Sequence, residues 1–121
     1  MSGWCAVGPL GRFPLGEALG IRADGCAIVV TREAGPDGAE DSVHAALDEC
    51  PHLGLALAGG LVRRGRLACP HHAYTYDLET GTRLVSGPSV NGPATSTLDD
   101  THRLDLLPAR IVDGHVEVQL A

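Results

Sequence analysis

Two short segments of this 121-residue sequence combine cysteine with histidine, two side chains that bind borderline and soft metal ions. The first is Cys50-Pro51-His52 and the second is Cys69-Pro70-His71-His72. Residues 53–68 lie between them, so each loop supplies one thiolate and one imidazole. The proline in each segment stiffens its loop. The pattern therefore predicts a metal centre that two loops build together, with two sulfur and two nitrogen donors.

The donor order discriminates between two kinds of metal centre. A structural zinc site also takes two cysteines and two histidines, but zinc fingers usually pair Cys with Cys and His with His. Here each loop holds one of each, which suits two adjacent irons, one bound by the cysteines and the other by the histidines. A zinc-stabilised interaction module without a redox role stays open as an alternative. Iron and acid-labile sulfide contents separate the two.

The sequence resembles Rieske-type 2Fe–2S ferredoxins. The matching residues are Cys50 to Gly54, Cys69 to His72, and then Tyr76-Asp77, Thr80-Gly81 and Gly87-Pro88 in the order of the family. The resemblance implies one 2Fe–2S cluster, with Cys50 and Cys69 on the inner iron and His52 and His72 on the outer iron. It implies that Gly87-Pro88 forms a third, shielding loop. The residues expected around the cluster are Leu53, Gly54, His71, Tyr74, Tyr76, Gly87 and Pro88.

Histidine ligation sets the redox range that the resemblance implies. Two ferric ions, two sulfides, two thiolates and neutral imidazoles sum to zero charge, so reduction costs less than for a four-thiolate cluster. The family range is roughly −150 to +300 mV. High-potential members carry a disulfide and a serine where this sequence has Leu55, His71 and Tyr74, which predicts the low-potential class. Tyr76 stands where the family places a tyrosine that hydrogen-bonds a ligand sulfur. His71 is the competing ligand beside His72, and the spacing favours His72.

Short antiparallel strands are the elements expected to position these loops. Sixteen glycines and eight prolines favour many turns over long helices. Turns are predicted at Asp24-Gly25, Arg64-Gly65 and Asp113-Gly114. Strands are expected over residues 26–30, 43–47, 61–63, 66–68, 74–76, 82–85, 104–112 and 115–120, and loops over residues 31–42 and 88–100. The fold class is all-β, and the resemblance implies a Rieske-type antiparallel β sandwich with a small cluster-binding subdomain built from two loops at one end. We expect a single domain over residues 1–121, with the cluster-binding portion at roughly 48–90.

Composition narrows the possible partners. The formal net charge is −6, and all nine basic residues are arginines without a basic stripe, which disfavours nucleic acid and anionic membranes. No apolar run reaches membrane-spanning length and no secretory signal is present, so we expect a cytoplasmic protein, monomeric when free. Cys5 and Cys26 are expected to be small buried side chains. Asp48-Glu49 is expected to be solvated and to steer a basic partner surface.

These features lead to three hypotheses about function. The first is a one-electron carrier, not itself an enzyme, that takes electrons from a flavin-dependent reductase and passes them to a terminal oxygenase or similar acceptor. The second is a small Rieske subunit of a larger oxidoreductase, such as a nitrite-reductase-like complex. The third is the zinc-stabilised interaction module.

Overall fold

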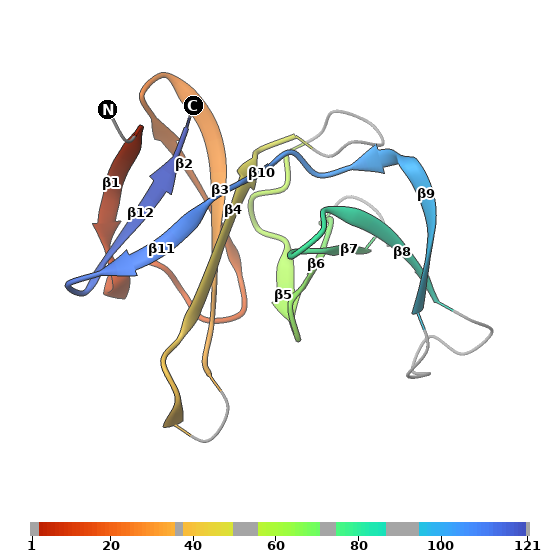
Figure 1. The fold of residues 1–121 in the computed structure, drawn as a ribbon, viewed down its shortest axis with the longest axis horizontal. Helices are drawn as coiled ribbons and strands as arrows, with labels where there is room; N and C mark the ends of the chain where they lie inside the picture. The colour runs from red at the N-terminus through yellow and green to blue at the C-terminus, as the bar shows by residue number, and fades with distance from the viewer. Residues whose placement is uncertain (1–2, 36–37, 50–55, 71–74, 87–94, 121) are drawn as a thin grey trace.

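Strands make up nearly all of the regular structure in the computed structural model (Figure 1), which describes residues 3–35, 38–49, 56–70, 75–86 and 95–120. One three-residue 3-10 helix, η1, spans Leu10–Arg12. The strands are β1 Trp4–Pro9, β2 Ala18–Ala23, β3 Cys26–Glu33, β4 Ser42–Leu47, β5 Leu61–Arg63, β6 Arg66–Ala68, β7 Thr75–Asp77, β8 Thr82–Ser86, β9 Thr95–Arg103, β10 Leu106–Leu107, β11 Ala109–Val112 and β12 His115–Gln119. This confirms the predicted all-β class. Within the described residues no helix is long and apolar enough to cross a membrane.

In the part of the chain that the structure describes, the strands form three antiparallel sheets. Their strand orders are β1-β12-β11, β10-β4-β3-β2 and β5-β6-β7-β8-β9. In Figure 1 the sheet of β3 and β4 lies between the other two. The middle sheet therefore separates the first sheet from the third, which contains β6, the strand that ends immediately before Cys69.

Side-chain alternation along β3 explains this layering. Ile28 and Val30 are fully buried in the core between the first two sheets, whereas Val29 is fully buried in the core shared with the third sheet. Successive strand residues point to opposite faces, so an unbroken apolar run serves two cores at once. On β4, Ala45 and Ala46 divide between the same two cores.

Three two-residue turns have the backbone that a tight hairpin needs. The φ angles are positive at both central residues of Asp24-Gly25, Arg64-Gly65 and Asp113-Gly114. This geometry matches the right-handed twist of the flanking strands. The three predicted turns are confirmed, and they join β2 to β3, β5 to β6 and β11 to β12.

Several predicted boundaries were wrong. Strand β3 continues to Glu33 because it pairs with β4 as far as Ser42, so the predicted loop over residues 31–42 is shorter. The predicted loop over residues 88–100 includes the start of β9, which pairs with β8. The predicted strand over residues 104–112 is broken at Pro108, where the chain passes from the middle sheet to the first. Strands β1 and β2 were not predicted individually.

The two cysteines outside the ligand segments differ from the prediction. Cys26 is exposed, because it begins β3 directly after the turn at the end of a hairpin, and Cys5 is only half-buried. Both are therefore useful controls for cysteine chemistry elsewhere in the chain.

Candidate metal centre

The two ligand segments follow different strands of the fold. The first begins at Cys50, after β4 ends at Leu47, and the second lies between β6 and β7. Of the four predicted ligands, Cys69 is described by the structure, and Cys50, His52 and His72 lie outside the described residues. Tyr76 is the described member of the predicted surroundings. The others, Leu53, Gly54, His71, Tyr74, Gly87 and Pro88, lie outside the described residues.

Cys69 is held on the core side of the chain as it leaves β6. Its exposed fraction is 4%, and it belongs to the same buried cluster as Leu67 and Leu57. Leu67 and Cys69 are buried while Ala68 between them is only half-buried, which is the alternation of an extended strand. The Cys69 thiol therefore lies in an apolar environment at the end of β6.

Tyr76 forms part of the wall behind Cys69. It is fully buried, it lies opposite Leu67 in the β6–β7 register, and it belongs to the cluster that contains Cys69. The structure thus brings these two predicted site residues into one core. The hydrogen bond from Tyr76 to a ligand sulfur stays a prediction.

Because Gly60 has no side chain, the chain that follows the first ligand segment can approach the backbone just before Cys69. A Cβ atom at Gly60 would lie 2.5 Å from the Ala68 carbonyl oxygen and 3.0 Å from the Leu57 carbonyl oxygen. The same stretch bonds to the middle layer, because Ala18 N–H donates to the Gly60 carbonyl at 2.9 Å and Gly59 N–H donates to the Ala18 carbonyl at 2.9 Å. The backbone before Cys69 is therefore packed directly against the end of the first loop.

Asp48 departs from its predicted role as a solvated charge. Its carboxylate oxygen Oδ1 accepts the backbone N–H groups of Leu57 at 2.6 Å and of Ala58 at 3.1 Å. Glu49 is exposed, as expected. The sequence contained a weak signal for this contact, because aspartate next to a loop often accepts backbone N–H groups, but it could not identify the partners.

The β5–β6 hairpin carries three arginines. Arg63 and Arg64 are exposed and Arg66 is half-buried. The backbone of the turn is tied to the middle sheet, since Gly65 N–H donates to Glu33 Oε1 at 2.7 Å.

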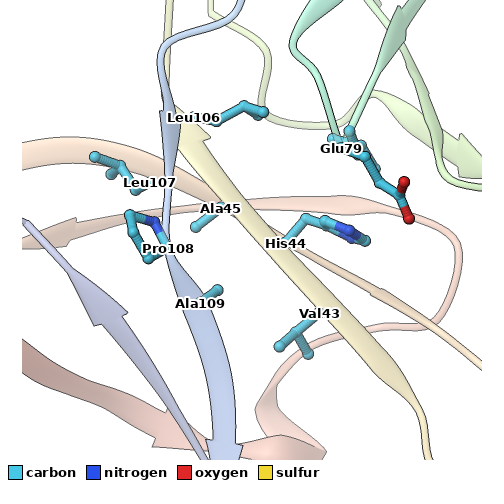
Figure 2. A pocket seen from close by; sticks show the side chains of 9 residues that line it. Val43, His44, Ala45, Glu79, Leu106, Leu107, Pro108 and Ala109 are labelled. Carbon is cyan, nitrogen blue, oxygen red and sulfur yellow. The ribbon is translucent and has the colours of Figure 1, made fainter.

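A groove of about 420 Å³ lies between β4, the β10–β11 segment and the turn after β7. Apolar side chains line most of it, including Leu78 and Leu106. Figure 2 shows His44 projecting from β4 towards the side on which Glu79 lies. His44 is half-buried on this wall. Among the described residues, the lining of the groove includes no cysteine.

The described part of the site fits an iron–sulfur cluster. Thiolates ligate such clusters, and the apolar surroundings of a ligand control solvent access and redox potential. Cys69 supplies a thiol within an apolar core, at the beginning of a segment that continues to His71 and His72.

Comparison with known families identifies the class of protein that this arrangement represents. Residues 3–99 match the Rieske [2Fe-2S] domain. The chain belongs to the Rieske domain family, and its cofactor is accordingly a Rieske-type 2Fe–2S cluster. The family match therefore favours the 2Fe–2S cluster over the alternative of a structural zinc site.

Curated relatives include parts of oxygenase systems. The chain is 38% identical over 64 residues to the oxygenase component of dicamba O-demethylase from Stenotrophomonas maltophilia, covering 53% of this chain and 17% of that protein. It is 32% identical over 88 residues to the oxygenase subunit of vanillate O-demethylase from a Pseudomonas species, covering 73% and 22%. The chain thus spans about a fifth of the length of these relatives.

Solved structures confirm the fold. A crystal structure of dicamba monooxygenase aligns with a TM-score of 0.72 at 25% identity, over 99% of this chain and 34% of that one. The ferredoxin of carbazole 1,9a-dioxygenase from Nocardioides aromaticivorans IC177 aligns with a TM-score of 0.72 at 20% identity, over 99% and 100%. A Mycobacterium tuberculosis chain described as an NADH-dependent nitrite reductase small subunit gives 0.70 at 21%, over 98% and 95%.

Proposed function

We propose that this chain is a one-electron carrier whose 2Fe–2S cluster is ligated by Cys50, His52, Cys69 and His72. The observation that carries the proposal is the position of Cys69, a buried thiol at the end of β6 in a chain of the Rieske family. When bound, the cluster supplies reversible one-electron reduction within the potential range of its family. The chain's own residues contribute the ligands, the apolar wall of Leu57, Leu67 and Tyr76, and the two-loop frame.

We further propose that residues 1–121 form one Rieske domain, with the cluster-binding portion at roughly 48–90. The described structure supports this division, because Leu57, Cys69 and Tyr76 belong to one buried cluster that also includes residues of the middle sheet. The second core lies between the first and middle sheets, whose strands contain none of the predicted ligands.

The partners proposed for this carrier are redox proteins. Its relatives and structural neighbours are components of oxygenase and reductase systems, which supports a role between a donor and an acceptor. We propose a flavin-dependent reductase as the donor and a terminal oxygenase or similar enzyme as the acceptor, in the cytoplasm, with the carrier monomeric when free. In this role the chain itself catalyses no substrate conversion.

A second candidate function is a small subunit of a larger oxidoreductase. The observation that favours it is the match along nearly the whole length of the nitrite reductase small subunit. Copurification of the tagged chain from its own cells distinguishes the two. A stoichiometric large subunit that survives gel filtration supports the subunit role, whereas a free chain that transfers electrons at a rate rising with acceptor concentration supports the carrier.

Spectroscopy of the reduced protein tests the cluster and its ligands. We expect the anaerobically reduced chain to give a rhombic electron paramagnetic resonance signal, with the low average g value of mixed His and Cys ligation. Cys69→Ser should lose most of its iron, its sulfide and this signal. The matched control is Cys26→Ser, because Cys26 is an exposed cysteine outside the ligand segments. Iron retention in Cys69→Ser equal to that in Cys26→Ser would refute the ligand assignment, and zinc without iron in the wild-type chain would refute the carrier.

A further inference from the structure

We propose that Asp48 is a positioning residue for the first ligand loop, whose carboxylate ties the loop's entry to its return. The inference deepens the proposed function and rests on it, because the segment between Asp48 and Leu57 contains Cys50 and His52. Nothing in the Cys-x-His pattern itself assigns a role to this aspartate.

The contact is a two-donor bond to one oxygen. Leu57 N–H and Ala58 N–H donate to Asp48 Oδ1 at 2.6 and 3.1 Å. Hydrogen bonds to an ionised acceptor are shorter and roughly twice as strong as neutral ones. A single side chain thus joins the two ends of the first loop across a sequence separation of nine residues.

The base of the contact is fixed to the middle sheet. Asp48 N–H donates to the Ala27 carbonyl at 3.0 Å, so the backbone that carries the carboxylate continues the pairing of β3 with β4. Gly20 on β2 leaves room for Ala58 and the Asp48 carboxylate. A Cβ atom at this position would lie 2.7 Å from Ala58 Cβ and 3.4 Å from Asp48 Oδ2. The sheet thus holds the carboxylate and leaves room for the returning loop.

The other side of the contact leads to Cys69. Leu57 is fully buried in the cluster that contains Cys69, and its carbonyl accepts Gly60 N–H at 3.0 Å. Gly60 in turn lies against the Ala68 carbonyl, immediately before Cys69. The position of the first loop's return relative to Cys69 therefore depends on the bond to Asp48.

Glu33 provides a matched control within the same fold. It also accepts a backbone N–H from the third sheet, that of Gly65, at 2.7 Å. This bond lies at the turn of the β5–β6 hairpin, at the opposite end of β6 from Cys69. A general loss of stability should thus follow from losing either carboxylate, whereas an effect on the cluster should follow only from losing Asp48.

The experiment measures release of the cluster from Asp48→Ala, Asp48→Asn and Glu33→Ala. Each purified holoprotein is mixed with an excess of an iron chelator, and the decay of the cluster's visible absorbance is followed together with thermal unfolding. Loss of a residue that supports a metal ligand costs about tenfold or more in metal binding. We expect Asp48→Ala to release its cluster about tenfold faster than the wild type. Asp48→Asn keeps an acceptor oxygen and should stay within about threefold of the wild type. Glu33→Ala should unfold at a lower temperature and release its cluster at the wild-type rate.

Several outcomes would overturn the inference. Equal release rates for wild type and Asp48→Ala would do so, as would faster release in Glu33→Ala to the same extent as in Asp48→Ala. If Asp48→Ala gives no folded protein, Asp48→Glu replaces it, because it keeps the charge but moves the oxygens by one methylene, and wild-type release from this variant then overturns the inference. A wild-type chain that binds no cluster overturns the proposed function and this inference together, whereas a loaded wild type with unchanged variants overturns only the role of Asp48.

Discussion

Gly60 packs closely against the backbone just before Cys69, and the cost of its replacement by alanine can be estimated. The new Cβ would lie 2.5 Å from the Ala68 carbonyl oxygen, 2.9 Å from Leu67 Cδ1 and 3.0 Å from the Leu57 carbonyl oxygen. Two of these three neighbours are backbone atoms, which cannot turn aside as a flexible side chain can. Relief of the contacts therefore requires the segments before Cys69 and after the first loop to separate.

The size of the effect follows from two opposing contributions. Overpacking a tight core costs about 1–3 kcal/mol, and backbone neighbours place Gly60→Ala at the upper end. Alanine also restricts the unfolded chain, which returns about 0.4–1 kcal/mol. The net loss in the free energy of unfolding is about 2 kcal/mol, or a fall in Tm of about 8 °C for a domain of this size.

Urea denaturation followed by circular dichroism measures this loss, and Gly11→Ala is the control. Gly11 lies in η1 and is exposed, and a Cβ added there would meet no other atom within 4 Å. Gly11→Ala should change the unfolding free energy by at most about 1 kcal/mol, in the stabilising direction. If Gly60→Ala and Gly11→Ala agree within about 0.5 kcal/mol, the close packing between the loops is not as the structure places it.

Three further substitutions test the core and the contacts between strands. Tyr76→Phe should lower the midpoint potential of the cluster by about 40 mV. This value assumes about 1 kcal/mol for the predicted hydrogen bond to a ligand sulfur and about 59 mV per tenfold change in the equilibrium constant. An unchanged potential in protein-film voltammetry would show that this bond is absent. Arg32→Ala should reduce the unfolding free energy by about 2 kcal/mol, because Arg32 donates to the Leu10 and Phe13 carbonyls at 3.2 and 3.1 Å and to Asp41 at 2.7 Å. Glu117→Gln, which weakens the more exposed pair with Arg110, should cost less than about 1 kcal/mol, and equal losses in urea titrations would contradict this ranking.

Local chemistry accounts for the features that the sequence alone determined. The order of Cys50, His52, Cys69 and His72 identified the family, because cluster ligation depends on residue types that can be read directly. The turns at Asp24-Gly25 and Asp113-Gly114 were likewise predictable, since a two-residue hairpin requires positive φ at both central positions and glycine supplies one of them without strain. The ligand roles of Cys50, His52 and His72 remain predictions, because these residues lie outside the part of the chain that the structure describes.

Contacts between distant segments decided the rest. The sequence predicted a solvated Asp48, but in the fold its carboxylate accepts the N–H groups of Leu57 and Ala58. The close approach of Gly60 to Ala68 likewise depends on the tertiary structure. Pro108 ends the pairing of β10 with β4 and directs the chain to the first sheet, a change of partner that local β propensity does not encode. Hydrogen-bond partners and burial depend on which strands become neighbours, so the residue types predicted the cluster and the tertiary structure decided how its loops are held.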